Sequence, residues 1–246
     1  MPLYRDEAIV LRTQKLGEAD RIATLLTRTH GKVRAVAKGV RRTSSRFGAR
    51  LEPFSHVDLQ LATGRTLDVV TQAVSISAYG EGIVGDYARY TTGTVLLETT
   101  DRLVVEEKEP ATQQHLLLAG ALRALSTGER EPALVLDSFL LRSLAISGYA
   151  PSFADCAKCG EEGPHRAFNP AAGGVVCSTC RPPASAMPAP PTITLLSALL
   201  TGDWPVAEGS DPRTRREANT LVTAFVAYHL DRNLRSLPHL DLTPDR

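Results

Sequence analysis

The sequence predicts a multi-domain α+β protein, in which a small β-barrel is followed by an α-helical domain with an inserted four-cysteine module. Three observations predict this architecture. Hydrophobic and polar residues alternate along short runs in the first 76 residues, and beyond Gly80 the hydrophobic residues recur at helical spacing. All four cysteines lie in two close pairs in the second half. The hydrophobic fraction of 43% is enough for a substantial core.

The N-terminal domain, predicted at residues 1–80, reads as strands joined by short turns. His30-Gly31 and Thr63-Gly64 are typical turn pairs. Five strands in so short a segment suit a small barrel, because closure leaves no strand edge unpaired. The OB-fold is the five-stranded barrel of this class, although another small barrel or a twisted sheet fits five strands equally well. The predicted strands are Glu7–Thr13, Arg21–Thr27, Gly31–Gly39, His56–Ala62 and Thr66–Ile76.

The second domain, predicted at residues 81–246, reads as helices. The first spans Ile83–Val105, the second ends near Gly128, and the third runs from Pro132 to Gly148. This third segment is apolar on nearly all sides, so we expect it at the centre of a helical bundle. Asp211-Pro212 is typical of the start of a further helix. Residues 181–191 contain five prolines and are predicted to form a linker or extended strap.

The positive charge of the chain is concentrated near the N-terminus, although its net charge is only +1. The segment Arg21–Leu51 holds nine Lys and Arg residues and no acid. Residues 81–246, in contrast, have 15 basic and 20 acidic residues. This asymmetry predicts a polyanionic partner for the first domain, and a solvated basic face is the plain alternative.

The cysteines form two C-x-x-C pairs, Cys156–Cys159 and Cys177–Cys180, with seventeen residues between them. Two residues between cysteines allow one tight turn to direct both sulfur atoms at one ion, and the spacing is usual for a four-cysteine zinc site. Because four thiolates close the coordination of Zn²⁺, we expect one structural zinc ion per chain. Two disulfides, a redox pair and a zinc deaminase site each fit worse, since no secretory signal and no His-x-Glu partner occur in the sequence.

Other features limit the function classes. The longest apolar runs, such as Leu116–Leu122, are far shorter than the roughly 20 residues of a membrane-spanning helix, and the N-terminus has no secretory h-region. We therefore expect a soluble, cytoplasmic protein with no membrane partner. No nucleophile–base pair or phosphate-binding loop is evident, so no catalytic residue is predicted and we expect a protein that is not an enzyme.

Motifs in both halves resemble one known family. The elements "GEADRI", "AKGVRR" with "SRFG", and "GYAP" followed by the two cysteine pairs occur together and in order. In this combination the chain resembles the bacterial RecO family of DNA repair and recombination mediators over essentially its whole length. The resemblance implies an OB-fold, a helical domain with a zinc module, and binding of single- and double-stranded DNA. It also implies strand annealing, help for a RecA-type recombinase on DNA coated by single-stranded-DNA-binding protein, a RecR-like partner, and association with the nucleoid during repair.

Together, the charge and the resemblance predict a DNA-binding surface that works mainly through phosphate contacts. Tyr4, Phe47 and Phe54 are the aromatic residues available for base stacking, and each is equally well a core residue. A protein adaptor that docks an acidic surface, and an RNA-binding OB protein, are the competing interpretations. The predicted DNA contacts are Lys32, Arg34, Lys38, Arg41, Arg42, Arg46 and Arg50.

The expected partnership with single-stranded-DNA-binding protein also predicts a peptide-binding groove. A short peptide of the single-stranded-DNA-binding protein, typically acidic and ending in an apolar residue, would need an apolar pocket with a basic rim. We expect such a groove in the helical domain, and Arg123, Arg130 and Arg142 are the predicted rim residues.

Overall fold

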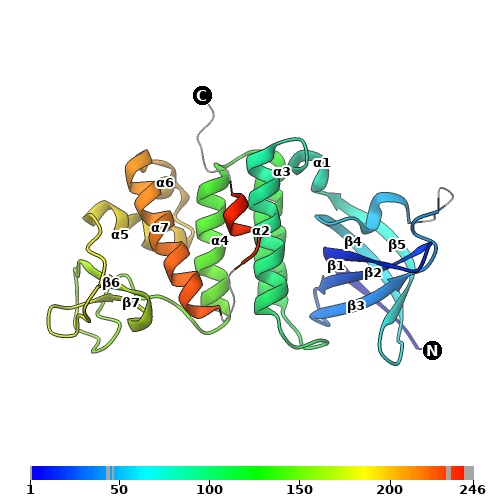
Figure 1. Ribbon diagram of the computed structural model, residues 1–246, viewed down its shortest axis with the longest axis horizontal. Helices are drawn as coiled ribbons and strands as arrows, with labels where there is room; N and C mark the ends of the chain where they lie inside the picture. The colour runs from blue at the N-terminus through cyan, green and yellow to red at the C-terminus, as the bar shows by residue number, and fades with distance from the viewer. Residues whose placement is uncertain (1, 43–44, 46, 231–233, 241–246) are drawn as a thin grey trace. The chain divides into compact units, whose positions relative to one another are not determined.

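The structure, a computed structural model, describes residues 2–42, 45, 47–230 and 234–240. Contacts divide the chain into two compact units. The first comprises Met1–Glu129 together with His239–Arg246, and the second comprises Arg130–Pro238. The helices α1 to α3 therefore group with the barrel, while the cysteine module and the remaining helices belong to the second unit (Figure 1). Among the described residues no helix combines the length and apolar character required to cross a membrane.

A closed barrel of five strands forms the described N-terminal part of the first unit. Neighbouring strands are antiparallel except β3 and β5, which pair in parallel at Ala35–Asp68 and Val36–Val69. Because β1 pairs with both β2 and β4, the sheet has no open edge. This confirms the predicted five-stranded barrel. The strands are β1 (Leu3–Leu16), β2 (Asp20–Thr27), β3 (Lys32–Ala37), β4 (Ser55–Ala62) and β5 (Asp68–Ala78), in the order β1-β2-β3-β5-β4.

The alternation in β3 separates a core face from an outer face. Val33, Ala35 and Ala37 are buried, whereas the residues between them are partly exposed. Gly31, just before this strand, has a φ of +64°. A Cβ atom there would lie 1.7 Å from the backbone carbonyl oxygen of Glu109, so the close approach of these two segments requires glycine.

Helices α1 (Gly80–Ile83), α2 (Tyr87–Leu103) and α3 (Thr112–Thr127) complete the first unit, with α2 packed against β1 and α3 against β2. The single helix predicted at Ile83–Val105 is wrong in its first turn. Asp86 starts a new helix, because its side chain accepts a hydrogen bond of 2.9 Å from the backbone N–H of Arg89. Helix α3 ends at Gly128, which is left-handed (φ +70°), as expected from the sequence.

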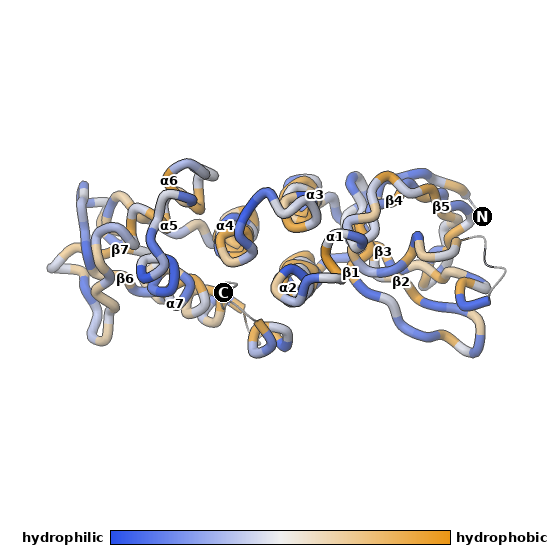
Figure 2. The backbone as a smooth tube through the Cα atoms, turned by 90° about the horizontal axis from the view of Figure 1, so that it is seen from above, coloured by the Kyte–Doolittle hydropathy of each residue, from blue (hydrophilic) through white to orange (hydrophobic). Residues whose placement is uncertain are grey.

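The second unit is built around α4 (Pro132–Ile146), which contacts both α5 (Pro190–Thr201) and α7 (Pro212–His229). Helix α4 is buried along most of its length, and Figure 2 shows that most of its residues are hydrophobic. This central position is the one expected from its apolar sequence. Asp211 caps α7 by accepting hydrogen bonds from the backbone N–H groups of Arg213 and Thr214.

Two helices of the second unit, α5 and α6 (Trp204–Glu208), were not expected from the sequence. Helix α5 begins with Pro190 and Pro191, the last residues of the proline-rich segment. Proline is well suited to the first turn of a helix, where its missing N–H is not needed. The short hairpin of β6 (Ala167–Asn169) and β7 (Gly174–Val176) lies between α4 and α5 in the chain.

Candidate metal centre and nucleic-acid interface

The cysteine pairs lie on two tight turns that the hairpin holds together. The first turn closes with a hydrogen bond from Gly160 N–H to the carbonyl of Cys156, and Gly160 has a left-handed φ of +74°. Ala157 N–H donates to the carbonyl of Val175 in β7, which fixes this turn beside the strand. Cys177 follows β7 directly, so the second pair begins where the strand ends.

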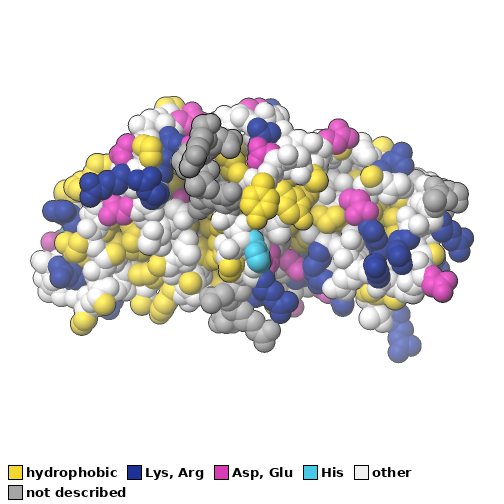
Figure 3. Space-filling view, turned by 45° about the horizontal axis from the view of Figure 1, so that its top comes forward, with side chains coloured by type: hydrophobic (Ala, Val, Ile, Leu, Met, Phe, Trp, Pro, Cys, Tyr) yellow, Lys and Arg dark blue, Asp and Glu magenta, His cyan; other side chains and the backbone are white. Residues whose placement is uncertain are grey.

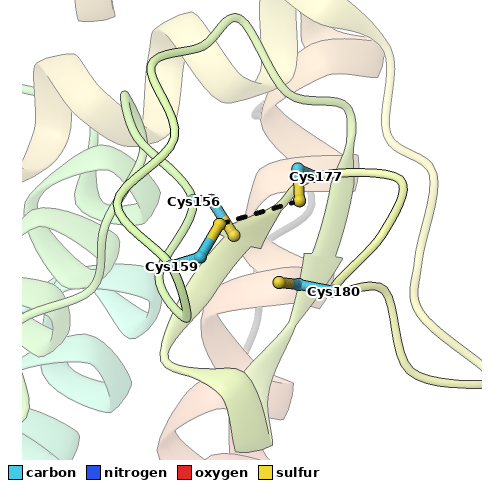
Figure 4. Close-up of side chains that lie close together, drawn as sticks. All are labelled: Cys156, Cys159, Cys177 and Cys180. Carbon is cyan, nitrogen blue, oxygen red and sulfur yellow. Dashed lines mark hydrogen bonds between the residues drawn. The ribbon is translucent and has the colours of Figure 1, made fainter.

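The sulfur atoms of all four cysteines converge on one point (Figure 4). They lie within 4.8 Å of one another, and Cys159 Sγ is 3.9 Å from Cys177 Sγ. A zinc ion with Zn–S bonds of about 2.3 Å would place neighbouring sulfurs about 3.8 Å apart, whereas a disulfide joins them at about 2.0 Å. All four cysteines are free. The geometry therefore fits a bound metal ion and brings together the ligands predicted from the spacing.

Backbone N–H groups stabilise negative charge at this centre. The hydrogen bond from the N–H of Cys177, helped by those of Cys159 and Lys158, lowers the pKa of Cys156 to about 6 although burial opposes it. In contrast, hydrogen bonding to the sulfurs of Cys159 and Cys177 raises the pKa of Cys180 to about 12. One thiolate forms readily, but four together need a cation to balance their charge.

Lys32 and Arg34, two of the predicted DNA contacts, already face acidic partners. Lys32 Nζ lies 3.0 Å from the carbonyl oxygen and 3.5 Å from the carboxylate of Asp101, and its side chain is only 12% exposed. Arg34 donates a hydrogen bond to the carboxylate of Glu107. These two cations thus join β3 to α2 and to the segment that follows it.

The remaining predicted contacts lie in the segment after β3 and in the 3-10 turn η1 (Gly48–Leu51). Lys38, Arg41 and Arg42 are exposed. The guanidinium of Arg41 donates to the carbonyl of Glu18 at 2.8 Å, and no ion pair joins Lys38 or Arg42 to an acid in the described part of the chain. Arg50 is exposed and lies 3.5 Å from the carbonyl of Phe47, while Arg46 lies outside the described residues.

Hydrogen bonds hold this segment at one end of the barrel. Gly39 N–H donates to the carboxylate of Asp20, and Arg41 N–H donates to the carbonyl of Ala19, so the segment lies beside the β1–β2 turn. Because β3 and β5 run parallel, with Ala35 opposite Asp68, the β4–β5 turn lies instead beside the start of β3. The exposed Arg65 in that turn is therefore separate from this segment. Figure 3 shows Lys and Arg side chains grouped over the barrel.

The three aromatic residues considered for base stacking have other contacts. Phe47 is 4% exposed and belongs to the barrel core. Phe54 is equally buried and lies against Gly93 of α2. Tyr4 donates a hydrogen bond of 2.5 Å to Asp68. These three rings are therefore packed or hydrogen-bonded within the protein, which leaves the exposed cations as the main candidates for DNA contacts.

The predicted rim of a peptide groove is divided between the units, since Arg123 is in the first unit and Arg130 and Arg142 are in the second. Arg130 lies 4.1 Å over the ring of Trp204 and pairs with Glu208, so it fastens α6 in place. A groove of about 870 Å³ does occur in the second unit between the cysteine module and α5. Acids outnumber arginines along it, which suits an acidic peptide poorly; its lining includes Asp155, Glu162, Arg166, Ile193, Asp203 and Val206.

Comparisons with known proteins agree over both halves of the chain. A family model described as "Recombination protein O N terminal" matches residues 1–79, and one described as "Recombination protein O C terminal" matches residues 84–238. A protein of Nocardioides sp. named DNA repair protein RecO is 64% identical over 242 residues, covering 97% of this chain and 99% of that protein. The protein of the same name from Streptomyces coelicolor is 60% identical, covering 98% and 100%, and that from Thermobifida fusca is 59% identical, covering 96% and 98%.

Proposed function

This chain belongs to the RecO family of DNA repair and recombination proteins, and we propose that it acts by binding DNA strands rather than by catalysing a reaction. In this proposal it binds single- and double-stranded DNA and anneals complementary strands. It also helps a RecA-type recombinase to replace single-stranded-DNA-binding protein, together with a RecR-like partner. Its place of action is the nucleoid, in the cytoplasm.

The main support for the DNA-binding proposal is the group of exposed cations after β3. Lys38, Arg41 and Arg42 lie together in a segment without acids, at the end of a barrel of the type that often binds single strands. Such cations bind phosphates of any sequence, because phosphate contacts carry no information about the bases. This property suits a protein that anneals any pair of complementary strands. Lys32 and Arg34 contribute less in this proposal, since each already faces an acid.

Replacing Arg41 and Arg42 together by Ala is expected to weaken single-strand binding and to change its dependence on salt. If about five cations contact phosphates, the log–log slope of affinity against salt is about −3.5, from about −0.7 for each phosphate. The double variant loses two contacts, so its slope becomes flatter by about 1.4. Fluorescence titrations of unrelated oligonucleotides at several salt concentrations measure this change, and the loss is expected to be similar for each sequence.

A matched pair of variants separates DNA contact from structural bracing. Replacing Lys32 and Arg34 together by Ala removes the same charge but also removes contacts with Asp101 and Glu107. This variant is expected to show a lower melting temperature and a smaller change of slope. An unchanged slope in a well-folded Arg41/Arg42 variant contradicts the proposed interface. If an acidic protein binds this surface and DNA does not displace it, the result instead favours the adaptor function.

We further propose that the metal held by Cys156, Cys159, Cys177 and Cys180 is zinc, with one ion per chain. Tetrahedral coordination by four thiolates is typical of structural zinc sites, and a closed site leaves no position for a substrate. When bound, the ion balances the charge of the thiolates and joins the two cysteine turns. In this role zinc supports the fold of the second unit and does not take part in a reaction.

The proposed partners are tested most directly by strand annealing. Complementary oligonucleotides are expected to anneal faster with the protein present, and annealing should continue when the strands carry single-stranded-DNA-binding protein. A RecR-like partner is expected to increase recombinase loading on the coated strand. Equal annealing rates with and without the protein would contradict the central part of the proposal.

A further inference from the structure

A second group of metal-ligating side chains lies within the first unit, far from the cysteines in the sequence. It consists of Glu7 in β1, His56 in β4 and His115 in α3. One potential ligand atom of each lies within 4.8 Å of those of the other two. The barrel pairing brings the first two together, since Ile9, next but one after Glu7, pairs with His56. Helix α3, packed on β2, then supplies the third residue.

His56 is the residue that most directly indicates a bound ligand. It is only 9% exposed, and neither of its ring nitrogens has a hydrogen-bond partner among the described residues. A neutral imidazole has one N–H donor and one acceptor nitrogen, and such groups are rarely left without partners when buried. The ring instead lies beside another imidazole, with its centroid 5.6 Å from that of His115. A metal ion would satisfy the acceptor nitrogen of His56.

His115 is oriented as a metal-binding histidine would be. It is 1% exposed, and its Nδ1 lies 3.1 Å from the backbone carbonyl oxygen of Leu26. Because a carbonyl oxygen only accepts, Nδ1 must carry the proton, which leaves the lone pair on Nε2. A histidine that binds a metal through one nitrogen commonly donates from the other to a carbonyl or carboxylate.

Glu7 supplies the negative charge of the group. Its Oε2 lies 4.0 Å from His56 Nε2 and accepts a hydrogen bond of 3.1 Å from Arg28. The side chain of Glu7 is 40% exposed, so solvent reaches this side of the group. The charge of Arg28 opposes a cation, and Glu7 would have to share its carboxylate between the two. Two imidazoles and one carboxylate suit Zn²⁺ and similar transition metals better than Mg²⁺ or Ca²⁺, which prefer oxygen ligands.

We propose that Glu7, His56 and His115 form a second metal site, which binds one Zn²⁺ or a similar divalent transition metal ion. With three protein ligands, the site keeps one position for water and differs from the closed cysteine centre. The ion connects β1, β4 and α3, and so links the barrel to a helix that covers it. The first unit then holds its own metal, independently of the second unit.

Cobalt binding to the full-length protein tests this site, after the cysteine centre has been loaded with zinc. Added Co²⁺ is expected to give visible absorption without the thiolate-to-metal charge-transfer bands of a cysteine site, and to reach one Co²⁺ per chain. His115→Asn removes Nε2 but keeps an N–H donor near Leu26, and Glu7→Gln removes the carboxylate charge while keeping the side-chain shape. Each is expected to weaken Co²⁺ binding at least tenfold. His239→Asn, at an exposed histidine outside the group, is the matched control and should bind as the parent protein does.

Melting temperature gives a second measurement. Added Zn²⁺ is expected to raise the melting temperature of the parent protein and of His239→Asn, but not that of Glu7→Gln. Circular dichroism verifies that each variant is folded before these comparisons. The proposal is overturned if His115→Asn and Glu7→Gln, both folded, bind Co²⁺ as tightly as the parent protein. It is equally overturned if no Co²⁺ binds beyond exchange at the cysteines, in which case His56 is simply a buried residue.

Discussion

Replacing Cys177 by Ser is expected to unfold the cysteine module and to sharply lower the yield of folded protein. The buried cluster of this module consists of Cys156, Ala167, Val176 and Cys177, so two of its members are the ligands themselves. Such a small core cannot hold the hairpin and both turns by burial alone. Structural zinc contributes on the order of 10 kcal/mol or more in small modules, and losing one of four ligands removes much of it. Zinc content per chain and proteolysis of residues 150–182 measure the effect.

The matched control is Ser178→Ala, because Ser178 is exposed and adjacent to the same ligand. This variant is expected to keep one zinc ion per chain and normal resistance to proteolysis. In the parent protein the thiols should react slowly until a chelator removes the metal. A parent protein with well under one zinc ion per chain and freely titratable thiols contradicts the proposed zinc centre.

The second large effect is expected at Asp137, an acid in the middle of the buried helix α4. Asp137 is 2% exposed, and its Oδ1 accepts a hydrogen bond of 2.8 Å from Asn219 of α7. Burial raises the pKa of Asp137 to about 7, although the hydrogen bond from Asn219 partly opposes the shift. An ionised carboxylate at this position is therefore unfavourable, and the folded protein binds a proton that the unfolded chain releases near pH 4.

The sign of the pH effect follows from this difference in proton binding. Between about pH 4 and pH 7 the folded state holds the proton and the unfolded state does not, so this group makes the protein less stable as pH rises. Asp137→Asn removes the dependence, since an amide does not ionise and still accepts from Asn219. At pH 8 the variant is expected to be more stable than the parent by up to roughly 4 kcal/mol, from about three pKa units at about 1.4 kcal/mol each. Near pH 4 the two should have similar stability.

Urea unfolding followed by the fluorescence of Trp204 measures this prediction in the second unit, because it is the single tryptophan of the chain. Glu129→Gln, at an exposed acid, is the control for removing one negative charge and is expected to leave the pH profile unchanged. Equal stability of Asp137→Asn and the parent protein at pH 8, with equal pH profiles, would show that Asp137 ionises without difficulty in the fold.

Much of the molecule follows from short-range patterns in the sequence. The alternation of Val33, Ala35 and Ala37 with charged neighbours predicts β3, since side chains of a strand point alternately to opposite faces. The spacing of the cysteine pairs predicts that their sulfurs meet, because each pair needs only one tight turn. Asp211-Pro212 predicts the start of α7 for the same reason, as capping involves residues within one turn.

Only the tertiary structure decided which distant side chains meet. Sequence shows that Lys32 and Arg34 are cations, but the packing of α2 and its following segment supplies Asp101 and Glu107 as their partners. It likewise leaves Lys38 and Arg42 without an ion pair to an acid in the described residues, and it buries Phe47 and Phe54.

The meeting of His56 with His115 is the clearest case of this limit. The two residues are far apart in the chain, and neither lies in a motif that predicts a ligand. Patterns within one turn or strand are set by local backbone geometry, so the sequence alone determined the barrel strands, the principal helices, the cysteine centre and the family of this protein. Partners from separate elements are set by the closure of the barrel and the packing of helices on it. The tertiary structure alone therefore decided which cations stay exposed and where the second group of metal ligands forms.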